Sequence, residues 1–180
     1  MLNKVITAAA MVLAMSAPAL AADDANLQVF REVSKQVNRY SNFTVFDSIS
    51  AEVNEGVVTL SGKVTMPFKS NDLEKRVAKV DGVQQVVNQI EVLPVSQFDD
   101  DLRLGIARAI YGNSNFWNYA SMVNPPIHII VERGHVTLEG VVNSNVDKAL
   151  ARSLAIGFSA FSVTNNLKTD AEMKLELEKI

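Results

Sequence analysis

The chain carries the phrase GVVTLSGKV at residues 56–64 and a second version of it, GHVTLEGVV, at residues 134–142. The two copies lie seventy-eight residues apart. In the first copy, Val58, Leu60 and Val64 fall on every second position, which is the period of a β-strand with one face buried. Each copy therefore predicts a strand at the centre of a small folding unit, and the unit occurs twice.

Helical periodicity predicts one helix before the first phrase and one after it. The inward-facing residues of the first helix, over residues 27–40, are Phe30, Val33, Val37 and Tyr40. Those of the second helix are Met66, Ser70, Leu73, Val77 and Val80, with Thr65 or Ser70 as a possible N-terminal cap. Asp81-Gly82 ends this helix, because glycine readily adopts the left-handed conformation that follows a helix.

Alternating residues predict two more strands, over residues 48–53 before the phrase and 83–92 after the second helix. Residues 54–56 predict the turn that joins the first strand to the phrase, with Gly56 supplying a positive φ. The order of elements is therefore α-β-β-α-β.

The second copy repeats this order, from a helix over residues 102–111 to a strand near residues 163–167. The residues lining its second helix are Val146, Leu150, Leu154 and Phe158, and the turn after that helix has no counterpart of Gly82. We therefore expect an α+β protein of two tandem modules, each with a three-stranded sheet and two helices, over residues 26–93 and 100–168. Residues 169–180 form a charged tail, which is either a frayed helix or docked on a partner.

The N-terminus has the pattern of a secretory signal peptide over residues 1–21. Lys4 precedes an uncharged run, and Ala19-Leu20-Ala21 supplies small residues for cleavage. The run is shorter than the roughly 20 residues of a membrane span, so an uncleaved anchor is the minor alternative. We expect cleavage near Ala21. The chain has no cysteine, which excludes disulfides and a lipid-modified cysteine.

The overall charge is mildly acidic, with 17 Lys and Arg against 20 Asp and Glu. The sequence shows no run of basic residues. This composition argues against nucleic acid as a partner and against simple polybasic docking on anionic lipid.

The two units resemble the BON domain. The likeness rests on the Gly-x-Val-Thr-Leu-x-Gly phrase, on a third strand reading Val-x-Asn-x-Ile or Val-x-Asn-x-Leu, and on the fold-forming glycines Gly56, Gly62, Gly82, Gly134 and Gly140. The resemblance implies a non-enzymatic protein of the cell envelope, here periplasmic, that contacts phospholipid surfaces or envelope proteins in osmotic or other stress. It implies no catalytic motif, cofactor or small-molecule substrate.

A search for chemistry finds no catalytic or metal site. His128 and His135 are the only histidines, and the predicted hairpin separates them too far to form a metal pair. Asp99-Asp100-Asp101 could be a cation site, but acids before a helix are more often caps that interact with its dipole. We expect no enzyme; a hydrolase that depends on either histidine is the alternative.

The two units differ most in the linker over residues 113–126, which is longer in the second unit. Its aromatic residues and methionine either fill the core or an interface between units, or contact a lipid or protein partner together with arginines of the preceding helix. The candidate contact residues are Arg103, Arg108, Phe116, Trp117, Tyr119 and Met122. The leading hypothesis is binding to a phospholipid surface. The alternative is a periplasmic protein-interaction scaffold that uses the sheet faces or the tail.

Overall fold

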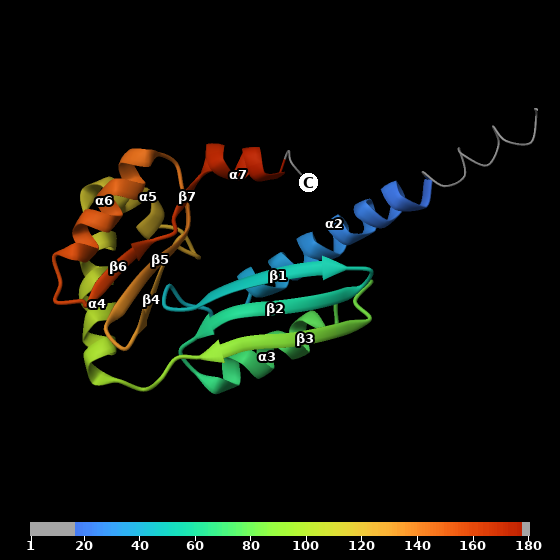
Figure 1. Ribbon diagram of the computed structural model, residues 1–180, viewed down its shortest axis with the longest axis horizontal. Coiled ribbons are helices and arrows are strands. Elements are labelled where there is room, and N and C mark those ends of the chain that lie inside the picture. The colour runs from blue at the N-terminus through green and yellow to red at the C-terminus, as the bar shows by residue number, and fades with distance from the viewer. Residues whose placement is uncertain (1–16, 178–180) are drawn as a thin grey trace, which may run out of the picture.

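The structure, a computed structural model, describes residues 17–177, with side chains described for residues 25–175. Most of the predicted signal peptide lies outside the described residues. No helix within the described part of the chain is both long and apolar enough to cross a membrane. The described residues form two α/β units that follow each other along the chain (Figure 1).

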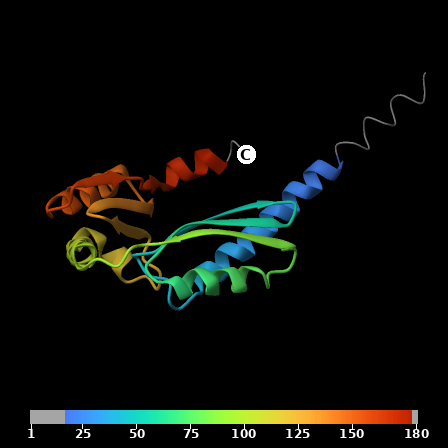
Figure 2. The same ribbon diagram turned by 60° about the horizontal axis from the view of Figure 1, so that its bottom comes forward.

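The first unit, which we call repeat 1, is a three-stranded sheet with two helices on one face (Figure 2). Its elements are α2 (Ala17–Asn38), β1 (Ser48–Asn54), β2 (Val57–Val64), α3 (Pro67–Val77) and β3 (Gln85–Val92). The central strand β2 pairs with β1 in the antiparallel sense and with β3 in the parallel sense. The predicted order α-β-β-α-β is therefore correct.

Repeat 2 has the same topology, with β5 at the centre between β4 and β6. Its elements are α4 (Gln97–Tyr111), the 3-10 helix η1 (Ser114–Phe116), α5 (Trp117–Ala120), β4 (Ile127–Glu132), β5 (His135–Val142), α6 (Asn145–Ile156), β6 (Ser162–Asn165), β7 (Lys168–Thr169) and α7 (Asp170–Leu177). The third strand is broken into β6 and β7, both parallel to β5, where the sequence predicted one strand.

The first helix buries Val33, Val37 and Tyr40 as predicted, but it buries Val29 in place of the predicted Phe30. Val29, Val33 and Val37 are 8%, 0% and 8% exposed. The predicted Phe30 is 40% exposed, because it lies about 100° around the helix from Val29. Steps of four residues keep the three valines in one line, so α2 buries valine and leaves the phenylalanine outside.

Two further residues predicted to face inward from a helix are instead exposed. Met66 precedes α3 and is half-exposed, and Val146 at the start of α6 is 74% exposed. The buried residues of α6 are Ala151 and Ala155, whose small side chains let α6 pack closely against α4. Neither predicted cap acts at α3, whose N-cap residue makes no side-chain hydrogen bond.

The two hairpin turns are built identically. Glu55 and Gly56 have φ angles of 48° and 80°, and Arg133 and Gly134 have 51° and 79°. Positive φ at both central residues defines the type I′ turn, which matches the twist of the strands that it joins. The sequence predicted the glycine of each turn but not the strained residue before it.

The second glycine of each phrase lies inside a strand, where the neighbouring strand comes very close. A Cβ atom on Gly62 would lie 2.1 Å from the Ser48 carbonyl oxygen, and one on Gly140 would lie 1.8 Å from that of Pro126. Both glycines also have φ near 120°, at 119° and 118°. The phrase is therefore bounded by glycines for two reasons, a turn at one end and a close backbone approach at the other.

Each third strand is tied to its helix by one asparagine. The Asn88 side-chain amide donates to Ser70 Oγ at 3.0 Å and to Glu74 Oε2 at 2.8 Å. The Asn165 amide donates to the Lys148 carbonyl at 2.9 Å. In both repeats the side-chain oxygen accepts the backbone N–H two residues later, at 3.1 Å and 3.3 Å. This explains the asparagine in the repeated Val-x-Asn pattern.

The repeats contact each other through the segment before β1. The Ile129 N–H donates to the Val45 carbonyl at 2.7 Å, so repeat 1 occupies the outer edge of β4. Phe46 packs against the hydrophobic core of repeat 2, and the Phe43 ring lies 5.3 Å from that of His128. Ser48 also donates to Glu139, and Lys63 forms an ion pair with Glu132.

Candidate functional site

Half of the candidate contact residues, two in the linker between α4 and β4 and one on α4, lie inside the protein. Phe116 and Tyr119 are 0% and 3% exposed, with ring centroids 5.9 Å apart. Arg103 is 4% exposed and donates to Asp100 and to the Val131 carbonyl. These three side chains are removed from any contact surface, because burial leaves them nothing to present to a partner.

The other three candidates remain at the surface. Trp117 is 76% exposed and Met122 is 48% exposed, and Arg108 is exposed on α4. Val123, which the sequence analysis did not single out, is 97% exposed. The linker therefore buries one aromatic pair and presents a separate apolar set to the surroundings.

Tyr119 is buried because it holds the junction between β5 and α6. Its hydroxyl donates to Asp147 Oδ2 at 2.9 Å and accepts the Asn143 N–H at 2.8 Å. Burial raises the pKa of this hydroxyl, and the nearby Asp147 carboxylate also raises it. The core-filling alternative therefore describes Phe116 and Tyr119, and the contact alternative stays open for Trp117 and Met122.

The three consecutive aspartates have separate structural roles. Helix α4 begins at Gln97, with Ser96 Oγ as its cap, so the acids lie in the first turns rather than before the helix. Asp99 is 0% exposed and accepts the N–H groups of Arg133 and Gly134 at 2.8 Å and 2.7 Å. The described residues contain no group of three or more acids and histidines placed to hold a metal ion.

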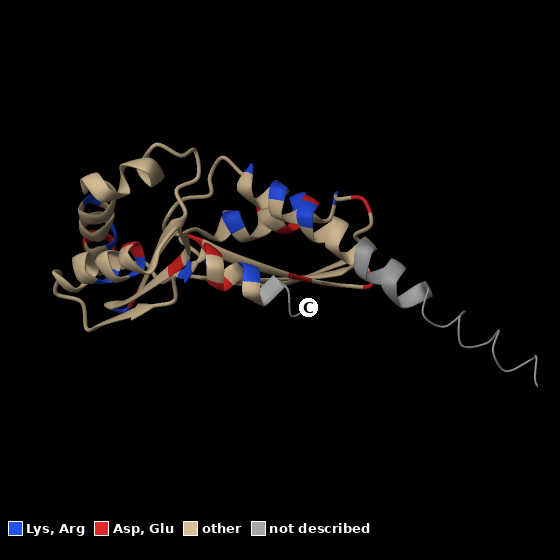
Figure 3. Cartoon of the chain, turned by 90° about the horizontal axis from the view of Figure 1, so that it is seen from above, with Lys and Arg blue, Asp and Glu red and all other residues tan. Residues whose placement is uncertain are grey.

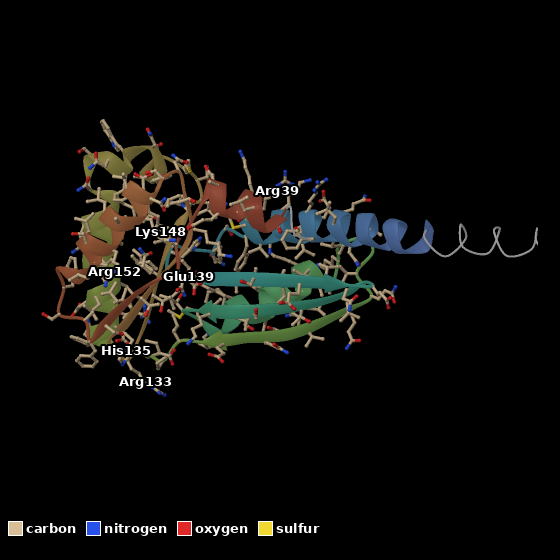
Figure 4. The ribbon with its side chains drawn as sticks, turned by 45° about the horizontal axis from the view of Figure 1, so that its top comes forward. Arg39, Arg133, His135, Glu139, Lys148 and Arg152 are labelled. Atoms are coloured by element: carbon tan, nitrogen blue, oxygen red, sulfur yellow. The ribbon has the colours of Figure 1, made fainter. Side chains whose placement is uncertain are left out.

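The two histidines lie at opposite ends of the β4–β5 hairpin. His128 pairs with Glu139 in the sheet register and His135 with Glu132. His128 is packed under Phe43, and burial lowers the pKa of its imidazole. His135 is exposed at the hairpin tip beside Arg133, within 2.8 Å of Ser162 Oγ (Figure 4). Within the described residues, Ser162 is the side chain hydrogen-bonded to His135, and no carboxylate is hydrogen-bonded to either histidine ring.

A basic surface on repeat 1 was missed by the sequence analysis. Its six cations come from two helices that pack together (Figure 3). They are Arg31 and Lys35 on α2 with Arg39 directly after it, which we call the α2 cations, and Lys75 and Arg76 on α3 with Lys79 in the turn after it, which we call the α3 cations. Because the two groups lie about 40 residues apart in sequence, no basic run reveals them. The prediction that the chain lacks a basic cluster is therefore wrong for the folded protein, where these six side chains come together.

Two hollows contain these cations. The larger, of about 800 Å³, is lined by the three α2 cations together with Phe30, Tyr40, Phe43, Val123 and Asn124. We call it the basic hollow. The second is lined by the three α3 cations and a single acid, Asp72, which accepts the Tyr40 hydroxyl at 2.8 Å. Arg76 lies 5.0 Å from the centre of the Tyr40 ring, so this tyrosine forms the ridge between the hollows.

The long linker of repeat 2 forms the far wall of the basic hollow. The Asn124 amide donates to the Asn38 carbonyl at the end of α2, at 2.5 Å. This contact brings Val123 and Asn124 to the hollow that the α2 cations line. The extra length of the linker therefore completes a site whose charges come from the other repeat.

A family model for the BON domain matches residues 23–94 and 118–171, which together make up most of the chain. The protein therefore belongs to the BON domain family, with two BON-like modules in an α+β fold. A search of curated proteins found no significant match.

Solved structures give a weak likeness to CdsD, described as a structural protein of the Type III secretion system of Chlamydia trachomatis. Its C-terminal domain is 14% identical with a TM-score of 0.31, over 79% of this chain and 65% of that one. A second CdsD structure is 12% identical with a TM-score of 0.30, over 84% of this chain and 96% of that one. The chain thus spans less than two thirds of the first of these structures.

Proposed function

We propose that the protein is a non-enzymatic component of the cell envelope that binds anionic phospholipid surfaces through the basic hollow and the exposed part of the linker. The observation that carries the proposal is the composition of the basic hollow. Arg31, Lys35 and Arg39 line it beside apolar side chains and no acid lines it, although Lys35 is paired with the exposed Glu32 at 3.2 Å. Family membership supports the same reading, since the resemblance already implied contact with phospholipid.

The charge at this surface is opposite to that of the whole chain. The two hollows together are lined by six Lys or Arg and one Asp, whereas the complete sequence has a net charge of −3. Each basic residue near an anionic membrane contributes about 1 kcal/mol, falling off with screening by salt. Concentrating the cations on one side lets an acidic protein approach an anionic surface in one orientation.

The exposed apolar residues supply the second half of the proposed contact. Trp117, Met122 and Val123 belong to the linker that walls the basic hollow, and Phe30 lines the hollow itself. Tryptophan is favoured where a membrane meets water, because its ring is apolar and its N–H can remain hydrated. We therefore propose that the cations attract the anionic lipid headgroups, while these apolar side chains enter the boundary between membrane and water.

Vesicle co-sedimentation tests the proposal. The purified protein should bind phosphatidylglycerol-containing vesicles at low salt, bind phosphatidylcholine vesicles weakly, and dissociate as salt rises. The double variant Arg31→Glu/Arg39→Glu should weaken binding by at least about tenfold. Arg152→Glu is the matched control, because Arg152 is exposed on α6 of repeat 2, away from Arg39 (Figure 4). Equal binding by both variants, or none by the unaltered protein, would contradict the proposal.

A scaffold that binds envelope proteins is the second candidate. Part of the tail proposed for this role is docked on the protein itself: Glu172 of α7 pairs with Lys148 at 3.2 Å. Thr169 and Glu172 exchange hydrogen bonds as a capping box that starts α7. The observation that favours a protein partner lies elsewhere, at the free edge of the first sheet.

A further inference from the structure

The outer edge of β4 in repeat 2 is already occupied by an extended segment. Residues 44–46 approach this edge, where the Val45 carbonyl accepts the Ile129 N–H at 2.7 Å. The next side chain, Phe46, enters the core beside the edge, in contact with the cluster that includes Ile110, Ile127 and Ile129. The segment therefore covers this edge with one backbone hydrogen bond and one aromatic side chain. Two side chains of α4 cover the rest of it: Tyr111 bonds the backbone N–H and carbonyl of Ile127, and Arg103 donates to the Val131 carbonyl.

Within the described residues, the equivalent edge in repeat 1 pairs with no further strand. Ala51 occupies the position of Ile129, since both lie at the same place in the hairpin register, paired with Leu60 and Leu138. The closing pair of the hairpin is Asn54 with Val57, so the N–H of Ala51 points away from β2. Among the described residues, none accepts a hydrogen bond from this N–H.

A groove lies beside the open edge, where Phe46 sits in repeat 2. It has a volume of about 300 Å³. Its lining residues are Phe30, Ser34, Val37, Asn38, Ile49, Ser50 and Ala51. Val37, Ile49 and Ala51 correspond to Ile110, Ile127 and Ile129, which belong to the cluster of repeat 2 against which Phe46 packs. We call this feature the edge groove.

The sequence of β1 does nothing to block a further strand. Ser48–Asn54 contains no proline and no lysine, and its one charged residue is Glu52. Edge strands that must stay unpaired usually carry such residues or a bulge. The free edge is therefore suited to accept a strand from outside, as in other proteins that recognise peptides by adding a strand to a sheet.

We propose that the edge groove binds an extended peptide segment of a partner protein, with an aromatic side chain directly after the residue whose carbonyl meets Ala51. Such a peptide would resemble the chain's own Thr44-Val45-Phe46, which makes these two contacts on the equivalent edge of repeat 2. The carbonyl accepts the Ala51 N–H, and the aromatic ring fills the space between Val37, Ile49 and Ala51.

A second copy of the chain is a poorer occupant. The residues that correspond to Val45 and Phe46, counted back from β4, are Val123 and Asn124. Val123 is 97% exposed, but Asn124 supplies an amide where the groove needs a ring, and it is bonded to Asn38 of its own chain. The aromatic requirement therefore favours a different protein.

A peptide with the sequence of residues 42–48, NFTVFDS, blocked at both ends, is the probe. Titrated into the isotopically labelled protein, it should shift the backbone amide resonances of Ala51 and Val53 and leave that of Ile129 unchanged, because the β4 edge is occupied. The same peptide with Phe46→Ala should bind at least about tenfold more weakly, because the buried ring is lost.

Two protein variants test the two contacts separately. Ala51→Pro removes the outward N–H at an edge position where proline is tolerated, and Ser34→Trp fills the groove. Both should reduce peptide affinity about tenfold, whereas Ser153→Trp, at an exposed serine of α6, should not. Ala51→Pro should leave vesicle binding unchanged, so failure of the peptide site and failure of the lipid proposal are distinguishable.

Three results would overturn the inference. The first is no amide shift at millimolar peptide, and the second is a shift confined to Ile129. The third is self-association in sedimentation velocity that Val123→Asp abolishes, which would make a second copy the occupant of the groove.

Discussion

The two repeats use different side chains to hold the end of the central strand against the start of the next helix. In repeat 1, buried Asp47 accepts the Thr65 N–H at 2.8 Å and pairs with Lys69 at 2.6 Å. In repeat 2, the Tyr119 hydroxyl accepts the N–H of Asn143, the residue equivalent to Thr65, and donates to Asp147, the residue equivalent to Lys69. The ion pair of repeat 1 and the hydroxyl–carboxylate hydrogen bond of repeat 2 therefore stabilise the same junction between strand and helix.

The exchange also explains why the linker of repeat 2 is long and aromatic. Asp47 directly precedes β1, whereas Pro125 occupies the corresponding position before β4 and has no polar side chain. A tyrosine from further back in the chain must reach the junction, and η1 and α5 bring it there. Trp117, the first residue of α5, and Met122, just after this helix, are then left at the surface. The exposed side chains are thus a consequence of how the junction was rebuilt.

Removing the buried carboxylate of repeat 1 should have the largest effect. Asp47→Ala leaves Lys69, which is 5% exposed, without its partner, and should lower the free energy of unfolding by about 3–5 kcal/mol. Urea denaturation measures the loss, and hydrogen exchange should localise it to repeat 1. Asp101→Ala, at an exposed acid, should change stability by less than about 0.5 kcal/mol. A loss at Asp47 as small as that would show that the ion pair is not what holds this junction.

Placing a side chain at the second glycine should harm both repeats alike. Gly62→Ala and Gly140→Ala each impose a backbone conformation that costs about 1–3 kcal/mol, and the collision with a backbone oxygen adds to it. Thermal unfolding of the two variants checks the symmetry. Gly157→Ala is the control, because that glycine has a φ of −64°. Tolerance of alanine in only one repeat would break the equivalence of the two phrases.

Losing the hydroxyl of repeat 2 should cost less than losing the carboxylate of repeat 1. Tyr119→Phe keeps the buried ring but leaves the Asn143 N–H without an acceptor, which costs about 1–3 kcal/mol. Trp117→Phe, at a side chain that is 76% exposed, should be nearly neutral. Chemical denaturation compares the two. A Tyr119→Phe loss equal to that of Asp47→Ala would mean that the charge of the first junction adds nothing.

The smallest expected difference between the repeats is the loss of stability in mild acid. His128 is partly buried in repeat 2, whereas its counterpart in repeat 1 is Ser50. Burial lowers the pKa of His128 below its usual value near 6.5, so the unfolded chain takes up a proton first as the pH falls. Stability is therefore full above about pH 6.5 and falls between that pH and the folded pKa, by at most about 1.4 kcal/mol per pH unit.

The variant His128→Gln should flatten this dependence. Denaturation from pH 7.5 to pH 5 measures the slope for both proteins, and His135→Gln, at the exposed histidine, should keep the slope of the unaltered chain. An unchanged slope in His128→Gln would assign the dependence to other groups. Below that range, Asp47 takes over: hydrogen bonds from Lys69, Thr65 and Thr44 overcome burial and lower the pKa of its carboxyl, so its contribution is lost as the pH falls through that value.

The repetition of the sequence made the fold predictable, because each periodic segment could be checked against its copy. Val58, Leu60 and Val64 were correctly placed inside, and all three are 0% exposed. The errors lie where one helix position decides between neighbours of equal hydrophobicity, as with Val29 and Phe30. Periodicity locates the buried face of a helix but does not resolve it to a single residue.

The polar contacts could not be predicted in the same way. Asp47 and Lys69 are 22 residues apart, and Tyr119 and Asp147 are 28 apart, without a shared motif. The linker aromatics were correctly recognised as unusual, but nothing in their spacing separates Tyr119, whose hydroxyl reaches Asp147, from Trp117, which points outward. The basic hollow depends on how α2, α3 and the linker pack, so it becomes visible only in three dimensions.

The contact of Val45 and Phe46 with repeat 2 joins two parts of the chain that are synthesised at different times. Ribosomes make repeat 1 first, so its docking segment exists before the edge that it will cover has been translated. A chain that stops short of β4 has no second core to receive Phe46 and displays an extended apolar segment, which proteases and chaperones commonly recognise. An incomplete chain therefore exposes the same residues that join the two halves of a finished one.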